Sequence, residues 1–172
     1  MIILIGPSAS GKTELGKLLE KHNIPKLVTY TTRNMRINEI DGKDYHFISN
    51  DTFKELINND FFYEYTLYNN NYYGTAKNSI TTNTYVILEP NGLESYKNTP
   101  NCISFYIDAN SDILFKRMLG RGDSLENAQS RINCDKITFN ETVKSSCNYV
   151  LDGTKDLNEL VNEILEKIDG LH

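Results

Sequence analysis

The chain opens with Met1-Ile2-Ile3-Leu4-Ile5, and this apolar run is followed at once by Gly6-Pro7-Ser8-Ala9-Ser10-Gly11-Lys12-Thr13. A short, continuously apolar run that ends at Gly-Pro is typical of a buried parallel strand. From Gly11 onward, leucines recur at helical spacing until Pro25 interrupts the pattern, which predicts a helix of about three turns. The octapeptide therefore connects a strand to a helix, and it fits the pattern G-x-x-x-x-G-K-[ST] in full.

This pattern, the Walker A motif, is typical of loops that bind the phosphates of ATP. Its glycines let successive backbone N–H groups turn inward, and the start of the following helix adds the positive end of its dipole. Lys12 can then reach the β- and γ-phosphate oxygens, and the Thr13 hydroxyl can coordinate Mg²⁺. We expect ATP to contact Gly6, Ser8, Ala9, Ser10, Gly11, Lys12 and Thr13.

The rest of the chain alternates between strand and helix patterns. Strands are predicted over residues 85–88, 102–107 and 149–151, and an apolar stripe predicts a last helix over residues 157–168. The first two of these strands are each followed by a turn and an amphipathic segment, and a long polar helix is predicted over residues 124–144. This alternation predicts an α/β protein with a parallel sheet, helices on both faces, and ligand-binding loops at the carboxyl ends of the strands.

Residues 29–79 have a different pattern and are rich in Tyr and Phe. The polar stretch 29–44 has no apolar period and is predicted to be an ordered loop, whereas residues 45–48 alternate like a strand. Ser49 can cap a short helix that contains Phe53, and an aromatic strand is predicted over residues 61–67. A turn is predicted at Asn69-Asn70-Asn71.

Composition excludes several classes of protein. A chain of 172 residues has room for one domain with its own core. The net charge of −5 and the pI near 5.2 argue against a nucleic-acid surface, and no apolar run approaches the roughly 18 residues of a membrane span. The three cysteines are odd in number and lack C-x-x-C spacing, so neither a disulfide framework nor a zinc site is indicated. We expect a cytoplasmic protein without a membrane or nucleic-acid partner, either monomeric or weakly homodimeric.

The arginines carry a separate signal. Of the 18 basic residues only five are Arg, and these fall in two segments: Arg33 and Arg36, then Arg117, Arg121 and Arg131. Clustered Arg in a chain that otherwise uses Lys suggests sites that need a planar fork to hold phosphate or carboxylate. The alternative is ion pairing on the surfaces of helices.

Residues 29–47 closely resemble the guanylate kinase pattern T-T-R-x-x-R-x-x-E-x-x-G-x-D-Y-x-F. The resemblance continues through Glu64, Tyr72-Tyr73-Gly74-Thr75 and Gly120-Arg121-Gly122, and it therefore covers nearly the whole chain. It implies a P-loop NTPase fold, a three-layer α/β/α core with a parallel sheet, to which a small α+β lobe that binds the nucleoside monophosphate (NMP) and a short lid are added.

The same resemblance implies a single domain over residues 1–172. Its core consists of residues 1–28, 80–120 and 136–172, its NMP-binding lobe of residues 29–79, and its lid of residues 121–135.

The resemblance also implies roles for individual residues. The GMP phosphate is bound by Arg33, Arg36, Tyr45 and Tyr73, since guanidinium forks and phenols suit a dianionic phosphate. Arg121 and Arg131 close from the lid over the ATP phosphates, Arg33 bridges donor and acceptor, and Asp152 falls near the position that touches adenine. Arg117 either joins these arginines or forms an ion pair on its own helix.

Base choice follows from hydrogen-bond donors and acceptors. Guanine presents its N1–H and 2-amino donors side by side, and the Glu64 carboxylate can accept both, whereas adenine would present a lone pair at N1. Thr29 and Thr75 complete this set with hydroxyl contacts, as their family counterparts do. The alternative is that Glu64 is a surface carboxylate on a strand.

One departure from the family pattern affects the metal site. Where guanylate kinases usually carry an Asp-x-Asp pair, this chain has Ile87-Leu88-Glu89, so the first acid is missing. Glu89 can still take the second carboxylate's role toward Mg²⁺ or the guanine amino group. The connection before this strand also looks short, and Tyr30 replaces the usual Ser, so we expect the rate or the base selectivity to be altered.

These observations predict a kinase that phosphorylates GMP, and also dGMP, by in-line transfer from ATP. No general base is needed because the acceptor is already an oxyanion, so Lys12, Arg33, Arg121 and Arg131 act by stabilising charge. One alternative is a related P-loop kinase that acts on another (deoxy)nucleoside monophosphate or on ribose bisphosphate. Another is a non-catalytic guanylate-kinase-like binding module, although such modules usually have a degraded phosphate loop.

Overall fold

A four-stranded parallel sheet forms the centre of the protein in the computed structural model, which describes residues 1–170. The strands lie in the order β6-β1-β7-β8, and each neighbouring pair is parallel. Their bounds are β1 (Ile2–Ile5), β6 (Tyr85–Ile87), β7 (Ile103–Asp108) and β8 (Tyr149–Asp152). The four predicted core strands are thus confirmed, and the strand that leads into the phosphate loop lies in the interior of the sheet.

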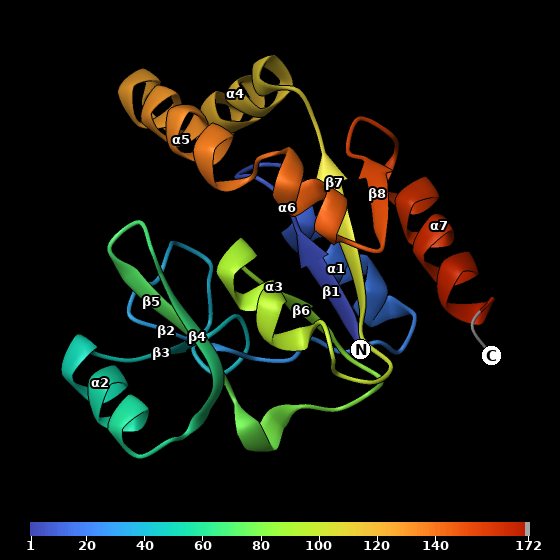
Figure 1. Ribbon diagram of the computed structural model, residues 1–172. Coiled ribbons are helices and arrows are strands. Elements are labelled where there is room, and N and C mark those ends of the chain that lie inside the picture. The colour runs from blue at the N-terminus through green and yellow to red at the C-terminus, as the bar shows by residue number, and fades with distance from the viewer. Residues whose placement is uncertain (171–172) are drawn as a thin grey trace.

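Helices cover both faces of this sheet. Helices α1 (Lys12–Lys21) and α7 (Leu157–Asp169) pack on one face, whereas α3 (Pro90–Tyr96) and α6 (Glu141–Ser146) pack on the other. Figure 1 shows α7 along the β8 side of the sheet and α3 between the core and the second sheet. The predicted three-layer α/β/α arrangement is confirmed.

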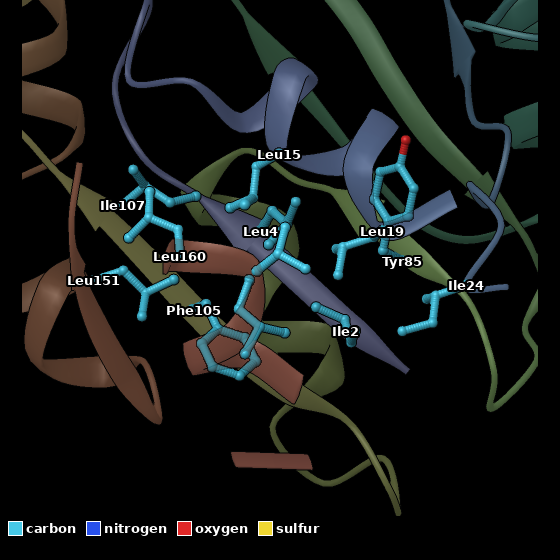
Figure 2. Close-up of a cluster of buried hydrophobic side chains, with 12 residues drawn as sticks. Ile2, Leu4, Leu15, Leu19, Ile24, Tyr85, Phe105, Ile107, Leu151 and Leu160 are labelled. Carbon is cyan, nitrogen blue, oxygen red and sulfur yellow. The ribbon is translucent and has the colours of Figure 1, made fainter. Parts of the chain in front are cut away.

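The two faces of β1 carry two separate hydrophobic clusters because side chains alternate along a strand. Leu4 points to the α1 and α7 side, where it lies with Leu15 and Leu160 (Figure 2). Ile3 belongs to the other cluster together with Leu93 of α3. Since β1 is fully buried on both faces, its sequence is apolar without interruption.

A second sheet belongs to residues 29–79, which we call the small lobe. Its strands lie in the order β3-β2-β5-β4, and helix α2 (Asn50–Asn58) and a short 3₁₀ helix (Lys77–Ser79) complete the lobe. The strand bounds are β2 (Tyr30–Thr31), β3 (His46–Phe47), β4 (Phe62–Tyr68) and β5 (Asn71–Ala76). In Figure 1 the small lobe lies beside the core at lower left, with its β4–β5 hairpin rising toward α5.

An aromatic stack holds the small lobe together. The Phe53 ring of α2 stacks on Phe62 at 4.4 Å between centroids and on Tyr72 at 5.1 Å. Ser49 caps α2 as predicted, since its side chain accepts a hydrogen bond from Thr52 N. The many aromatic residues of this segment therefore form a core of their own.

Two helices form a third body, which we call the helical pair. Helices α4 (Ser111–Gly120) and α5 (Leu125–Thr138) pack against each other at the top of the molecule in Figure 1. Their contact has its own small apolar cluster, made by Leu114, Met118, Ala128 and Ile132. Ser124 caps α5 as predicted.

Two sequence predictions were wrong in detail. The single helix predicted over residues 124–144 ends at Thr138, because the Phe139 side chain turns into the core and Asn140 caps the new helix α6. The stretch 29–44, predicted to be a loop throughout, contains the short strand β2. The predicted boundaries of core, lobe and lid stay predictions, and α5 continues past residue 135.

No helix within residues 1–170 is both long enough and apolar enough to span a bilayer.

Candidate active site

The phosphate loop lies between β1 and α1, as its sequence predicted. A Cβ atom at Gly6 would lie 2.6 Å from the Ile107 carbonyl oxygen, so only glycine lets the loop approach β7 this closely. The Lys12 ammonium folds back over the loop and donates to Gly6 O at 2.5 Å and to Pro7 O at 2.8 Å. Burial lowers the pKa of Lys12, although the carboxylates of Glu89 and Asp135 oppose this effect.

A cavity in front of this loop gathers side chains from all three bodies of the protein. Its volume is about 150 Å³. The phosphate loop contributes Ser8 and Lys12, the small lobe contributes Arg36, and the helical pair contributes Arg121 and Arg131. The remaining predicted site residues on its wall are Ala9, Thr13, Arg33, Tyr45, Tyr73 and Glu89. We call this space the phosphate cavity.

The phosphate cavity is strongly cationic. Within residues 1–170 the guanidinium groups of Arg36 and Arg131 have no hydrogen-bond or ion-pair partner, and Arg121 pairs only with Asp123, at 2.7 Å. Burial lowers the pKa of Arg36, and the neighbouring charges of Arg33 and Arg131 lower it further. A bound polyanion would relieve this repulsion, since guanidinium forks pair well with phosphate oxygens.

Arg33 is held in place by an acid of its own segment. Its guanidinium donates to both Glu39 oxygens, at 2.7 and 3.0 Å, and the same carboxylate accepts Arg36 N at 2.7 Å. The Arg33 guanidinium also lies over the rings of Tyr45 and Phe47, with Cζ 5.5 and 5.6 Å from the centroids. The position of Arg33 is therefore fixed by contacts within the protein.

The second cavity adjoins the first and contains Glu64. Its wall includes Thr29, Tyr45, Glu64, Tyr73, Ile87 and Glu89. Of these, Tyr45, Tyr73, Ile87 and Glu89 also line the phosphate cavity, so the two spaces meet there. We call this second space the base cavity.

Glu64 faces inward from β4. It is only 7% exposed, and Thr75 Oγ1 donates to its Oε1 atom at 2.6 Å. Burial raises the pKa of this carboxyl to about 7, against the two hydrogen bonds from Thr75. The alternative interpretation of Glu64 as a surface carboxylate is wrong.

The two tyrosines shared by the cavities remain hydrogen-bond donors. Burial is the first cause that raises the pKa of Tyr45 and of Tyr73, and the phenols therefore stay protonated at neutral pH. Their rings meet edge to face, with centroids 6.1 Å apart. A phosphate group placed between them and the arginines would meet donors only.

Glu89 follows strand β6 and is the N-cap residue of helix α3. Its Oε2 atom is buried without a hydrogen-bond partner, and burial raises the pKa of the carboxyl to about 7 despite the nearby Lys12 charge. Ile87, which stands where the family pattern has the first acid, lines both cavities as an apolar side chain.

The side chains that could hold Mg²⁺ are Thr13 and Glu89, which line the same cavity. Within residues 1–170 no three His, Cys, Asp or Glu side chains form a metal cage. Mg²⁺ in phosphoryl-transfer sites is usually held by one or two protein oxygens together with substrate phosphates and waters. The unpaired Oε2 atom of Glu89 fits such a site.

Arg117 and Asp152 lie outside the walls of both cavities. Arg117 donates to Gly153 O at 2.8 Å and to Ala9 O and Ser10 O at 3.4 Å, so it holds the backbone of the phosphate loop. Within residues 1–170 it forms no ion pair on its own helix, and its joining the other arginines stays a prediction. Asp152 is exposed and accepts hydrogen bonds from Thr154 N and Oγ1. Its contact with adenine stays a prediction.

Lys26, Tyr68 and Asp135 are among the residues near the site that were not predicted from the sequence. Lys26 lines the phosphate cavity, donates to Asp44 O, and lies 4.5 Å from the centroid of the Tyr45 ring. Tyr68 also lines it, and its hydroxyl donates to Asp135 Oδ1 at 2.5 Å. Asp135 was detectable in principle, because it falls at helical spacing on the buried face of α5 that carries Ala128 and Ile132.

Comparisons with known proteins agree with this geometry. The sequence model described as guanylate kinase matches residues 1–170. A guanylate kinase from Helicobacter pylori is 35% identical over 180 residues, which cover 91% of this chain and 87% of that protein. A guanylate kinase from Clostridium perfringens is 32% identical over 182 residues, which cover 99% of this chain and 81% of that protein.

Solved structures agree in fold. The crystal structure of guanylate kinase from Anaplasma phagocytophilum matches with a TM-score of 0.75 at 20% identity, covering 99% of this chain and 84% of that one. A shikimate kinase from Bacteroides thetaiotaomicron, 17% identical, matches with a TM-score of 0.55 over 98% of this chain and 97% of that one. The P-loop α/β fold predicted from the sequence is thereby confirmed. Since the family's sequence model spans residues 1–170 and relatives above 30% identity match over more than four fifths of their length, the chain belongs to the guanylate kinase family.

Proposed function

We propose that this protein transfers the γ-phosphoryl group of ATP to GMP, and also to dGMP, to give ADP and the corresponding nucleoside diphosphate. The observation that carries the proposal is the meeting of two cavities at Tyr45, Tyr73 and Glu89. One is cationic and contains the phosphate loop, and the other is small and contains a buried carboxylate. Family membership supports the enzyme, and neither the sugar-phosphate kinase nor the non-catalytic module is favoured.

In the base cavity, Glu64 recognises guanine. Its ionised carboxylate accepts the N1–H and 2-amino hydrogens, while Thr75, already bonded to it, and Thr29 place hydroxyls beside the base. Adenine lacks the 2-amino group and presents an acceptor at N1, so a buried carboxylate would face a lone pair. A good bidentate base contact is worth about 1–3 kcal/mol of discrimination.

In the phosphate cavity, positively charged side chains from the core, the small lobe and the helical pair bring the two polyanions, ATP and GMP, together. Arg33, Arg36, Tyr45 and Tyr73 bind the acceptor phosphate, and its oxygen attacks the γ-phosphorus in line. Lys12 leaves Gly6 O and Pro7 O to meet the donor phosphates, and Arg121 and Arg131 stabilise the charge that spreads over the transferred group. No side chain has to remove a proton, because the attacking oxygen is already ionised.

Thr13 and Glu89 would hold Mg²⁺ beside the donor phosphates. When bound, the ion would neutralise part of the charge on the phosphates. Asp152 is proposed to lie beside the adenine of ATP, at the carboxyl end of β8.

We further propose that the protein works in the cytoplasm as a monomer or weak homodimer, without membrane or nucleic-acid partners. The acidic net charge of −5 and the free state of all three cysteines support this.

A coupled assay of ADP release tests the function. GMP, dGMP, AMP, CMP, UMP and ribose bisphosphate are offered in turn with ATP and Mg²⁺. We expect turnover with GMP and dGMP, with AMP lower by at least tenfold in kcat/KM. Turnover with none of the acceptors contradicts the kinase, and a preference for AMP contradicts the role of Glu64. The same assay on Glu64→Gln tests the role of Glu64. Glu55→Gln, which alters an exposed carboxyl of α2, is its charge-matched control.

A further inference from the structure

A carboxylate of helix α5 occupies a hydrogen-bond donor of the phosphate loop. Ser8 N donates to Asp135 Oδ2 at 2.7 Å, and the Tyr68 hydroxyl donates to Asp135 Oδ1 at 2.5 Å. Asp135 is only 3% exposed, and both of its oxygens are used. The three residues belong to the core, the helical pair and the small lobe, so one side chain joins all three bodies of the protein.

This carboxylate is hydrogen-bonded to a residue of the phosphate cavity. Ser8 lines the phosphate cavity together with Lys12 and Thr13. The Asp135 charge is close enough to Lys12 and Glu89 to act on the ionisation of both. Donor phosphates placed in this cavity would therefore meet a negative charge at the edge of their own loop.

Both Lys12 and the Ser8 amide of the phosphate loop are hydrogen-bonded to acceptors within the protein. Lys12 donates to the Gly6 and Pro7 carbonyls, while the Ser8 amide donates to Asp135. A lysine and a loop amide that could hold phosphate oxygens are thus both paired with acceptors of the protein itself. Hydrogen bonds to a charged acceptor are among the stronger ones in proteins, so breaking this one has a measurable cost.

We infer that Asp135 is a latch that holds the ligand-free site shut: it takes the Ser8 amide as a nucleotide phosphate would, and ATP has to displace it. This inference rests on the proposed function, because it assumes that the phosphate cavity binds the donor nucleotide. Displacement frees Asp135 from Ser8 and Tyr68 together. Donor binding is thereby coupled to the contact between α5 and the small lobe.

The test measures ADP binding by isothermal titration, with and without Mg²⁺. Asp135→Ala removes the acceptor, and we expect its Kd for Mg²⁺-free ADP to fall about tenfold. Tyr68→Phe removes one of the two bonds that hold Asp135, and we expect a fall of about threefold. Glu126→Gln, an exposed carboxyl in the first turn of α5, removes the same charge and should leave Kd unchanged.

A second measurement follows the latch without any ligand. In the ligand-free protein the Ser8 amide should exchange its hydrogen slowly, and in Asp135→Ala it should exchange at least tenfold faster, as followed by NMR. The double variant Asp135→Ala/Tyr68→Phe should bind ADP no more tightly than Asp135→Ala alone, because both changes act on one contact.

Several results would overturn the inference. Unchanged or weaker binding of Mg²⁺-free ADP by Asp135→Ala, with unchanged exchange at Ser8, would show that Asp135 only supports the fold. Weaker binding that appears only with Mg²⁺ would make Asp135 a helper of the metal site. If Asp135→Ala does not fold, Tyr68→Phe decides alone. Wild-type protein that binds no ADP at all would remove the proposed donor site as well, whereas binding unaffected by either variant removes the latch only.

Discussion

The ionisation of Glu64 is the residue-scale property with the clearest consequence. Burial raises its pKa to about 7, well above the usual range of a carboxyl group, so Glu64 changes its ionisation near neutral pH. A protonated carboxyl cannot accept two hydrogens from guanine. Acceptor binding should therefore depend on pH in a range where most carboxylates are fully ionised.

We predict that kcat/KM for GMP rises about tenfold between pH 6 and pH 8. The sign follows from the raised pKa: Glu64 is mostly protonated at pH 6 and mostly ionised at pH 8, and kcat/KM reports the free enzyme. A phosphate monoester itself ionises with a second pKa near 6, so part of the rise belongs to the substrate. Glu64→Gln keeps that part and the contribution of Glu89, whose pKa is also raised to about 7, so the difference between the two profiles reports Glu64. Equal pH profiles for wild type and Glu64→Gln would contradict the prediction.

Arg33 allows a second prediction at this scale. Its bidentate contact with Glu39 is half-buried but lies within one short segment of the small lobe, so losing it should change stability by about 1–2 kcal/mol. Its charge, in contrast, faces the reacting phosphates in the proposed mechanism. We predict that Arg33→Ala lowers kcat about a hundredfold or more while Tm moves by only a few degrees.

The control for Arg33 is Arg33→Lys, which keeps a charge but loses the planar fork. Its kcat should fall between those of wild type and Arg33→Ala. A folded Arg33→Ala protein with the kcat of wild type would remove Arg33 from the catalytic residues.

At the residue scale, sequence motifs predicted many of the side chains that line the two cavities, because each motif lies on one short segment. The phosphate loop, the two arginines of the small lobe and Glu64 all line the cavities as expected. Lys26, Tyr68 and Asp135 were missed because their roles depend on contacts between segments far apart in the chain. The Tyr68 and Asp135 contact, for example, spans 67 positions.

The close packing of helix α3 on strand β4 determines the surroundings of Glu64. Helix α3 packs against β4, and Gly92 of α3 faces Glu64. A Cβ atom at Gly92 would lie 2.9 Å from Glu64 Oε2, closer than real Cβ contacts allow. A helix with a side chain at this position would push the carboxylate out of place.

We predict that Gly92→Ala raises KM for GMP about tenfold or more and leaves the Kd for ADP unchanged, as measured by steady-state kinetics and titration. The reason is local, since the added methyl group meets the recognition carboxylate and not the phosphate loop. Alanine otherwise favours the helix, so the variant should fold. Ser95→Ala, exposed on the same helix, is the matched control. An unchanged KM would show that Glu64 does not contact the acceptor.

The sequence predicted elements well where local chemistry decides them. Ser49 and Ser124 cap the helices assigned to them, and the four core strands fall where apolar runs placed them. The end of α5 was not predictable in this way, because it depends on Phe139 reaching the core. Strand β2 has only two residues, and its partners β3 and β5 define it more than its own sequence does.

At the scale of the whole molecule, charge from separate bodies converges on one space. Arg33 and Arg36 come from the small lobe, and Arg121 and Arg131 from the helical pair, while the protein as a whole is acidic with a net charge of −5. The sequence showed the clustering of these arginines but not their meeting, which depends on how the bodies pack. Their repulsion acts against the ligand-free fold, and this makes stability sensitive to ionic strength.

We predict that Arg131→Gln raises the Tm of the ligand-free protein by about 2–4 °C at 20 mM NaCl, which corresponds to roughly 1 kcal/mol in a chain of this size. Burial and then the charges of Arg33 and Arg131 lower the pKa of Arg36, and removing the Arg131 guanidinium relieves part of that repulsion. At 500 mM NaCl the gain should shrink to less than half, because the Debye length falls from about 20 Å to about 4 Å. Lys136→Gln, exposed one turn further along α5, changes the net charge equally and should lower Tm or leave it unchanged. If both variants shift Tm by the same amount at both salt concentrations, overall charge explains the effect, and the convergence of arginines stores no repulsive energy for the nucleotides to release.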